Sequence, residues 1–558
     1  MKFSEMPYER LNREETEAKM KSLIERQKQA LSGEEQFDIH KEYYELFNHI
    51  KTCTVLAAIR HDIDMTDEFY EKEQEFYDEI DPVLQQLDKE YHKVLFHSPY
   101  RPYMEEKIGK VAFKNMELQF KSMDEKLIEL CQENNGLISR YTKLIATAEI
   151  PFEGEICNLS RMRKFMADDS REVRRKAWEA VSDYFLKVTD EIDHIYDEMV
   201  KNRTKQAELM GYENYIELGY YRMQRNSYGQ QEVEKFRSQV KKYLVPLATR
   251  IHENRRKRLG LEKLSYIDEN MFFPEGNPAP KGTPEEILDK GQKMYQELSP
   301  ETKEFFDFMM EHELLDVLGR KTKRQGGYMD YLPDFKSPFI FANFNGTSAD
   351  VDVITHECGH AFQGFLMRNE EIQEYLDITM ETAEIHSMAM EYFTEKWMES
   401  FFGDRAEDYR RMHLEDGICF VPYGCMVDEF QHIVYANPDM TPAERKQVWK
   451  DLEQEYRPHM DYEGDEFFGE GGWWQKQSHI FQMPFYYIDY CLATVCALQY
   501  KRKIDIDEKE AWENYLKLCR LSAEKFYVPM LEEAGLKSPF ADGCMEELTQ
   551  HFAKVLFE

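Results

Sequence analysis

His356, Glu357 and His360 form the pattern His-Glu-x-x-His, whose residue types and spacing can bind a metal ion. Two histidines four residues apart lie on one face of a helix, so both imidazoles can reach a single tetrahedral Zn²⁺. Glu357 adjoins the first histidine and can act on water as a general base, whereas Cys358 lies on the far side of the helix and is expected in the core. Two histidines leave a zinc site incomplete, so a third ligand is required and the fourth position stays open to water. We therefore predict one hydrolytic Zn²⁺ per chain, against the alternative of a solvated or core-satisfied motif.

The segment 379–393, which we predict to be helical, offers the third ligand. Glu381, Glu384 and Glu391 fall near one helical stripe, because steps of three and seven residues return to the same face. An acidic stripe among methionines and aromatic residues needs a partner, and a cation supplies one. Spacing leaves Glu381 and Glu384 open as the ligand. His386 points elsewhere and is interpreted as a supporting donor or a bystander.

These motifs resemble the M3 family of zinc oligopeptidases, which includes thimet oligopeptidase and oligoendopeptidase F. The resemblance covers roughly residues 324–500 and is greatest to the shorter bacterial oligoendopeptidases. The matching blocks are His356-Glu357-x-Gly359-His360 after Asp350-Val351, Glu384-x-x-Ser387 after Thr382-Ala383, and His479 followed by Phe485-Tyr486-Tyr487-x-x-Tyr490. The family's third zinc ligand is the glutamate of its E-x-x-S segment, so the resemblance implies that His356, His360 and Glu384 bind the metal.

The resemblance also implies that His479, Tyr487 and Tyr490 stabilise the oxyanion that forms during hydrolysis. Imidazole and phenol groups can donate hydrogen bonds to an oxyanion without being ionised. Tyr487 and Tyr490 are three residues apart and should share a helix face, whereas Tyr486 should face away from Tyr490. The alternative is a stripe of aromatic core residues. The preceding loop 468–474 contains three glycines and is either a mobile cover over the substrate or a simple turn.

The rest of the chain predicts a mainly α fold. Glutamate, lysine, leucine and methionine favour helices, and helix starts are expected at Thr283-Pro284, at Thr441-Pro442 and at a capping box that begins with Asp169. Strands are predicted at 326–328 and 337–347, where aromatic and β-branched residues are dense. An edge strand there could pair with a peptide backbone, or it could belong to a small buried sheet.

The domain organisation is inferred from a break near residues 150–154. We predict a helical N-terminal lobe over residues 1–150 and a catalytic zinc-peptidase domain over 151–558. The resemblance implies a two-lobed helical body around a deep substrate channel, with a small β-sheet near the zinc site. Such a channel would admit short unfolded peptides and exclude folded proteins.

Composition limits the partners and the compartment. The chain has 72 basic and 107 acidic side chains, a net charge of 72 − 107 = −35, which argues against nucleic-acid binding. The N-terminus lacks an apolar signal region, no stretch is apolar enough to span a membrane, and the ten cysteines include no C-x-x-C pair. We therefore expect a cytoplasmic protein whose partners are oligopeptide substrates and neither nucleic acid nor membrane, and we leave its oligomeric state open.

The leading hypothesis is a zinc-dependent endopeptidase that hydrolyses internal bonds of short unfolded oligopeptides. A related zinc peptidyl-dipeptidase or carboxypeptidase is the first alternative, and a closed channel end or an arginine that binds a substrate carboxylate would favour it. A non-catalytic peptide-binding helical protein is the second alternative. The intact Glu357 argues against that second alternative, because a site that has lost its activity needs no general base.

Overall fold

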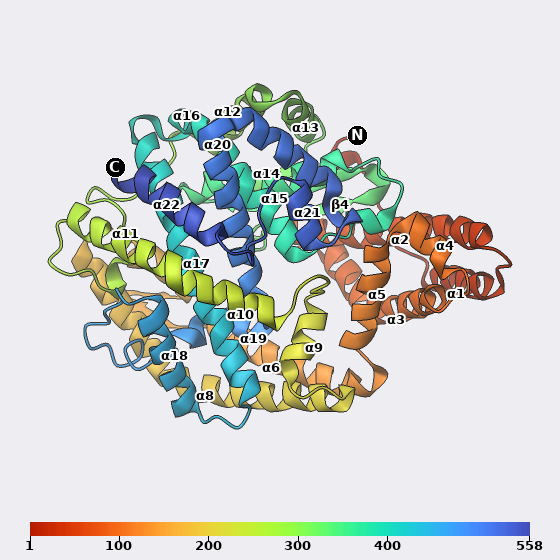
Figure 1. Cartoon of the computed structure of the whole chain (residues 1–558), viewed down its shortest axis with the longest axis horizontal. Helices are drawn as coiled ribbons and strands as arrows, with labels where there is room; N and C mark the ends of the chain where they lie inside the picture. Colours follow the sequence, from red (N-terminus) through yellow and green to blue (C-terminus); the bar gives the residue numbers. More distant parts are fainter. The chain divides into compact units, whose positions relative to one another are not determined.

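Helices dominate the structure, a computed structural model that describes the side chains of residues 1–521 and 523–558 (Figure 1). The chain divides into two compact units. Two small sheets complete the secondary structure of the described residues. The prediction of a mainly α fold is confirmed.

The first unit comprises Met1–Glu117, Pro278–Ala406 and Tyr500–Leu536. Its N-terminal helices pack through a hydrophobic cluster that includes Met20, Ile24, Ile39, Tyr43 and Tyr91. The helices with residues in this unit are α1 (Arg13–Gln29), α2 (Gly33–Ile63), α3 (Glu68–Phe96), α4 (Arg101–Ile108), most of α5 (Lys110–Ser122), α12 (Pro284–Leu298), α13 (Pro300–Glu311), α14 (Ala349–Leu366), α15 (Met380–Phe393), α16 (Met398–Phe402), the C-terminal part of α20 (Tyr487–Leu521) and α21 (Tyr527–Glu533).

A three-stranded sheet in the first unit lies against α14. Strand β5 (Ser337–Phe344) is central, pairs parallel with β3 (Leu315–Leu318) and pairs antiparallel with β4 (Tyr328–Leu332). The first six residues of β5 are buried, as expected for a central strand covered on both faces. Both β4 and β5 contact α14. The strand predicted at 337–347 is confirmed as far as Phe344, whereas the one predicted at 326–328 is displaced, because β4 begins only at Tyr328.

The second unit comprises Leu118–Asn277, Glu407–Gln499 and Lys537–Glu558. Its small sheet is an antiparallel pair, β1 (Ile150–Phe152) with β2 (Glu155–Cys157). The helices with residues in this unit are the C-terminal end of α5, α6 (Ile128–Ala146), α7 (Leu159–Met166), α8 (Arg171–Met210), α9 (Tyr215–Arg222), α10 (Gln230–Gln239), α11 (Val245–Arg258), α17 (Ala406–Ala436), α18 (Pro442–Tyr456), α19 (Ser478–Gln482), the N-terminal part of α20 and α22 (Cys544–Phe557).

Two of the three predicted helix starts are confirmed. Thr283 and Thr441 each cap a helix with a capping box and a following proline. The prediction at Asp169 is wrong, because α8 is capped one residue later, at Ser170. The guanidinium of Arg174 donates to the carbonyl oxygens of Asp168 and Asp169, so this turn is held by an arginine in place of a capping side chain.

Both units are assembled from separate segments of the chain. The division at residue 150 and the substrate channel therefore stay predictions. Within the described part of the chain, every helix is too short or too polar to cross a lipid bilayer.

Candidate active site

Helices α14 and α15, which carry the predicted metal ligands, lie side by side (Figure 1). Gly359 sits at their contact. A Cβ atom there would lie 2.5 Å from the carbonyl oxygen of His386 and 2.5 Å from the Cα of Ser387, both on α15. Any side chain at this position would push the two helices apart, because closely packed backbones cannot yield locally. The glycine inside the motif thus sets how near the ligands of the two helices can come.

His356, His360 and Glu384 form a histidine–carboxylate triad. One donor atom from each lies within 4.8 Å of the others. Oε2 of Glu384 is 3.4 Å from Nε2 of His356 and 3.9 Å from Nε2 of His360. Ligand atoms bound tetrahedrally to zinc at 2.0–2.1 Å lie roughly 3.3 Å apart. Two imidazoles and one carboxylate at this spacing fit a catalytic zinc site with one position left open.

His356 is oriented by a hydrogen bond on the side of the ring away from the triad. Nδ1 of His356 lies 2.6 Å from Oε1 of Glu391. Such a contact fixes the tautomer and the ring orientation of a metal-binding histidine. It leaves Nε2 of His356 to face Glu384. Nε2 of His360 lies 3.9 Å from Oε2 of Glu384.

Glu384, rather than Glu381, completes the triad. The Ser387 hydroxyl, one helical turn later, donates to Oε2 of Glu384 at 3.2 Å. This contact gives the E-x-x-S spacing a physical role, because it holds the carboxylate toward the histidines. Glu381 is fully buried in the same helix. The geometry of the triad favours Glu384 over Glu381, and its role as the third metal ligand stays a prediction.

Neighbouring carboxylates and burial shift the pKa values of the two triad histidines in opposite directions. Burial lowers the pKa of His356, but the hydrogen bonds that its ring donates to the carboxylates of Glu384 and Glu391 outweigh burial and raise that pKa well above its usual range. Burial lowers the pKa of His360 to about 4. A metal ion would therefore displace a proton from His356 when it binds. Burial also raises the pKa of the half-buried Glu357, as suits a general base.

Asp350 anchors the ligand helix to the sheet. Its carboxylate oxygens accept from the backbone N–H of Asn345 at 2.8 Å and from that of Gly346 at 2.7 Å. These two residues form the turn between β5 and α14. Asp350 is almost completely buried, so the turn cannot rotate without breaking both bonds. Asp350 belongs to a block that resembles the family, but no function was predicted for it from the sequence.

Cys358 and His386 lie in the core of the first unit. The Cys358 thiol is fully buried, as expected for a residue on the far side of α14. His386 is also fully buried, and neither ring nitrogen has a hydrogen-bond partner within the described part of the chain. Tyr515 donates to the His386 carbonyl at 2.7 Å, which ties α20 to α15.

The second unit gathers the predicted oxyanion donors into a tyrosine cluster, defined by His479, Tyr486, Tyr487 and Tyr490. The imidazole centroid of His479 lies 5.8, 4.9 and 6.1 Å from the three tyrosine rings in that order. His479 is on α19, and Tyr487 and Tyr490 are in the first turn of α20. All three of these residues are half-buried, so their polar atoms can meet a ligand. The approach of this cluster to the triad stays a prediction.

The expectation for Tyr486 is wrong. Its ring centroid is 4.9 Å from that of Tyr490, closer than the 5.7 Å between Tyr487 and Tyr490. Tyr486 precedes the first residue of α20, so helical spacing does not apply to its side chain. It is buried and packs beneath His479 and Tyr490.

A strained turn positions the tyrosine cluster. Phe485, between α19 and α20, has a φ of +67°, which is rare for a bulky residue. Its N–H donates to Oε1 of Gln431 at 3.1 Å, and its carbonyl accepts from Arg225 at 2.7 Å. Arg225 also forms a buried ion pair with Asp489 in the first turn of α20. Residues far away in the sequence therefore enforce a conformation that the local sequence disfavours.

The glycine-rich loop before this cluster is closely packed. A Cβ on Gly469 would lie 2.5 Å from the Asp465 carbonyl oxygen, and one on Gly471 would lie 2.3 Å from that of Lys446. Gly471 also has a φ of +82°. Its glycines thus have a packing function, which favours the turn over the mobile cover.

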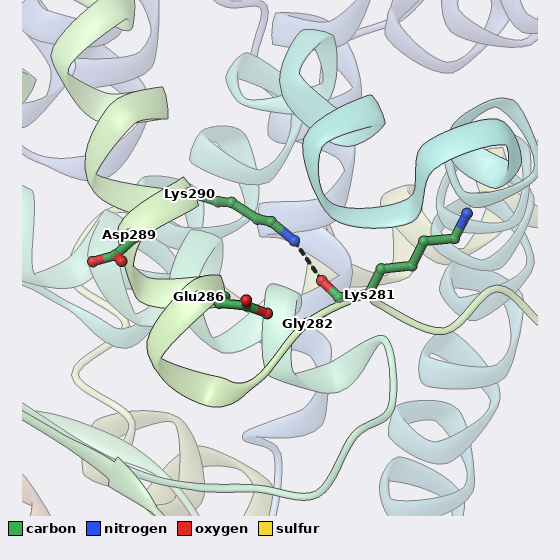
Figure 2. Close-up of a pocket in the computed structure, with 5 residues that line it drawn as sticks. All are labelled: Lys281, Gly282, Glu286, Asp289 and Lys290. Atoms are coloured by element: carbon green, nitrogen blue, oxygen red, sulfur yellow. Dashed lines mark hydrogen bonds between the residues drawn. The ribbon is translucent and has the colours of Figure 1, made fainter.

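A surface pocket of about 430 Å³ lies at the start of α12 (Figure 2). Its lining carries both signs of charge, and the Lys290 ammonium donates to the Lys281 carbonyl. None of the predicted site residues lines it. The pocket is therefore separate from the triad and from the tyrosine cluster.

Comparisons with known proteins identify relatives of the whole chain. The model of peptidase family M3 matches residues 164–275 and 291–549, and the model of the peptidase M3 N-terminal domain matches residues 3–123. A solved structure of PZ peptidase A with an inhibitor superposes with a TM-score of 0.92 at 46% identity, covering 100% of this chain and 99% of that one. Group B oligopeptidase PepB of Streptococcus agalactiae serotype III (strain NEM316) is 21% identical over 92% of this chain and 87% of its own length. Chromosomal oligoendopeptidase F of Lactococcus lactis subsp. cremoris is 23% identical over 70% of this chain and 64% of its own length.

Proposed function

Because the chain belongs to peptidase family M3 and is a metallopeptidase, we propose that it is a zinc-dependent endopeptidase acting on short unfolded oligopeptides. The observation that carries this proposal is the triad of His356, His360 and Glu384 beside Glu357. The donor set is that of catalytic zinc sites, and the base adjoins the first ligand. Similarity to an oligopeptidase and to an oligoendopeptidase supports the choice of substrate.

The residues in and around the triad have separate roles in the proposed hydrolysis. Zinc, when bound by the triad, supplies a Lewis acid that acidifies water and polarises a peptide carbonyl. Glu357 takes a proton from the attacking water and later passes it to the leaving amine. Glu391 and Ser387 keep His356 and Glu384 in the orientation that the ion needs.

The developing oxyanion needs neutral donors, and the tyrosine cluster contains them. Burial lowers the pKa of His479 and raises that of Tyr487, so both groups stay uncharged near neutral pH. We assign the oxyanion contacts to His479, Tyr487 and Tyr490, whose donors can strengthen as charge develops. The peptide backbone itself is proposed to pair with β4, which lies at an edge of the sheet and contacts α14.

The test is cleavage of an internally quenched decapeptide by the protein as purified, after treatment with a chelator, and after zinc is returned. Internal cleavage that is lost with the chelator and restored by zinc is expected, with products identified by mass spectrometry. Cleavage only near one end would replace the proposal with a peptidyl-dipeptidase or carboxypeptidase. Zinc binding without cleavage of a broad peptide set would favour a peptide-binding protein.

All ten cysteines are free thiols, and most are buried. A chain that keeps this many reduced cysteines suits a reducing compartment. We therefore propose that the enzyme acts in the cytoplasm, where short peptides are its substrates.

A further inference from the structure

A chain of hydrogen bonds leads to His479 from within the second unit. The Tyr423 hydroxyl on α17 donates to Oε1 of Gln477 at 2.7 Å. Nε2 of Gln477 lies 2.8 Å from Nδ1 of His479. Gln477 directly precedes α19, the short helix that carries His479. One carboxamide thus joins a half-buried phenol to an imidazole of the proposed site.

Tyr423, at the far end of this series of hydrogen bonds, is held rigidly. The guanidinium of Arg457 lies 5.2 Å from the centre of the Tyr423 ring, and it is bonded to Glu269 at 2.8 Å and to Glu453 at 3.2 Å. The Tyr423 ring also meets the Tyr487 ring edge-on, at 5.9 Å and 90°. A fixed cation over the ring draws electron density from the phenol and makes its hydroxyl a better donor. Tyr423 is therefore set to donate toward Gln477.

A carboxamide has two unlike ends, since its oxygen only accepts and its nitrogen only donates. If the Tyr423 hydroxyl occupies the oxygen, the amide nitrogen of Gln477 must face Nδ1 of His479. Nδ1 must then carry the lone pair, and the proton of the neutral ring must sit on Nε2. Nε2–H is the group that an oxyanion donor requires, whereas an unprotonated Nε2 would repel the negative charge.

We propose that Gln477, held by Tyr423, is a positioning residue that fixes His479 as the Nε2–H tautomer, ready to donate to the oxyanion. This inference rests on the proposed function, since it assigns the direction of a bond in that same site. It also limits His479 to donation, because a ring with its proton on Nε2 cannot accept one there.

The first experiment reads the tautomer without using activity. The zinc-loaded enzyme is labelled with ¹⁵N-histidine, and long-range ¹H–¹⁵N spectra distinguish a protonated from an unprotonated ring nitrogen. The His479→Gln spectrum identifies the signal to follow. We expect Nε2–H in the wild type and Nδ1–H in Gln477→Glu, whose carboxylate can only accept. An Nδ1–H signal in the wild type would overturn the inference, because it would mean that the amide points the opposite way.

The second experiment measures turnover of the decapeptide. Gln477→Glu should lower kcat by about 100-fold with little change in KM, since a lost oxyanion donor acts in the transition state. Tyr423→Phe keeps the ring and removes only the hydroxyl, so a smaller loss and a mixed tautomer signal are expected. Gln482→Leu, on the same helix but bonded to Thr142, is the matched control and should leave both readouts unchanged.

A double-mutant cycle separates positioning from folding. If Gln477 acts only through His479, Gln477→Glu should add no further loss of kcat to His479→Ala. An additional loss in that background would overturn the inference. Unchanged zinc content and melting temperature show that the variants fold. If the wild-type protein cleaves no peptide, the proposed function fails on its own, while the tautomer spectrum still reports the hydrogen-bond direction.

Discussion

The triad of the first unit and the tyrosine cluster of the second are positioned by different physical effects. In the triad, carboxylates from one helix turn the histidines of its neighbour, and their charge raises the pKa of His356 despite burial. In the cluster, burial dominates and lowers the pKa of His479, while a strained turn and aromatic packing set the geometry. A metal site needs charge that the ion will neutralise, whereas an oxyanion site needs donors that remain neutral.

The largest expected effect belongs to the general base. Glu357→Gln should keep zinc, because the three ligands are intact, and should lower kcat by roughly 10²–10⁴-fold. Peptide cleavage and zinc content measured on the same sample test both parts. Glu371→Gln removes an equal charge from an exposed position in the segment between α14 and α15, and it should leave both unchanged. Full activity in Glu357→Gln would exclude the proposed mechanism.

The next three variants distinguish a residue that binds zinc from residues that only orient the zinc ligands. Glu384→Ala should lose the most zinc, and Glu391→Gln should weaken zinc binding by roughly 10–100-fold through the freed His356 ring. Glu381→Ala should weaken it less than either. Competitive titration with a zinc indicator gives the three affinities. Equal losses from Glu381→Ala and Glu384→Ala would mean that the triad is wrongly composed.

Variants of the tyrosine cluster should act on turnover and spare the metal. Tyr490→Phe should lower kcat more than it raises KM, because its hydrogen bond is proposed to form in the transition state. Zinc affinity should equal that of the wild type, in contrast to the triad variants. A change confined to KM would place Tyr490 among the groups that bind the ground-state peptide.

Two glycines test whether the regions are held independently. A Cβ at Gly359 would meet the α15 backbone at 2.5 Å, and one at Gly219 would meet the Phe485 ring at 2.6 Å. Each alanine variant should lose about 1–3 kcal/mol of stability through overpacking. Only Gly359→Ala should weaken zinc binding, while Gly219→Ala should lower kcat by shifting the turn before α20. Thermal melts, zinc titration and peptide turnover are measured on both variants. A loss of zinc affinity in Gly219→Ala would mean that the two regions are not held independently.

The same contrast explains how much the sequence could predict. Helical periodicity and charge predicted His356, His360 and an acidic stripe that contains Glu384, whereas the choice of Glu384 within that stripe came from the family resemblance. The capping boxes at Thr283 and Thr441 were likewise readable, because each involves residues within a single turn. Local rules succeed where the stabilising contacts are local.

The cluster was predictable in composition but not in arrangement. Tyr486 precedes its helix, and the turn at Phe485 depends on Arg225 and Gln431, which lie far away in the sequence. No periodic pattern links these residues, so their contacts emerge only from packing. The support that Gln477 gives to His479 was missed for the same reason, since its partner Tyr423 lies on α17.

The smallest expected effect concerns a lysine near the cluster. The Lys476 ammonium lies 4.0 Å from the Trp473 ring centre and 4.8 Å from that of Trp178. Burial lowers the pKa of Lys476 to about 7, and the charges of Arg457 and Arg163 act in the same direction. This is the opposite of His356, whose carboxylate neighbours raise its pKa.

The pH dependence of stability follows from this pKa. The unfolded chain binds the Lys476 proton up to about pH 10.4, whereas the folded chain releases it near pH 7, so folding becomes more favourable as pH rises between the two values. Lys476→Met should therefore melt above the wild type near pH 6, and the difference should shrink toward about pH 9. Lys476→Arg stays charged throughout and should keep the wild-type melting temperature only at the acidic end, falling below it as pH rises. A difference between wild type and Lys476→Met that is constant with pH would mean that the ammonium stays protonated and that burial does not govern charge in this region as it does at His479.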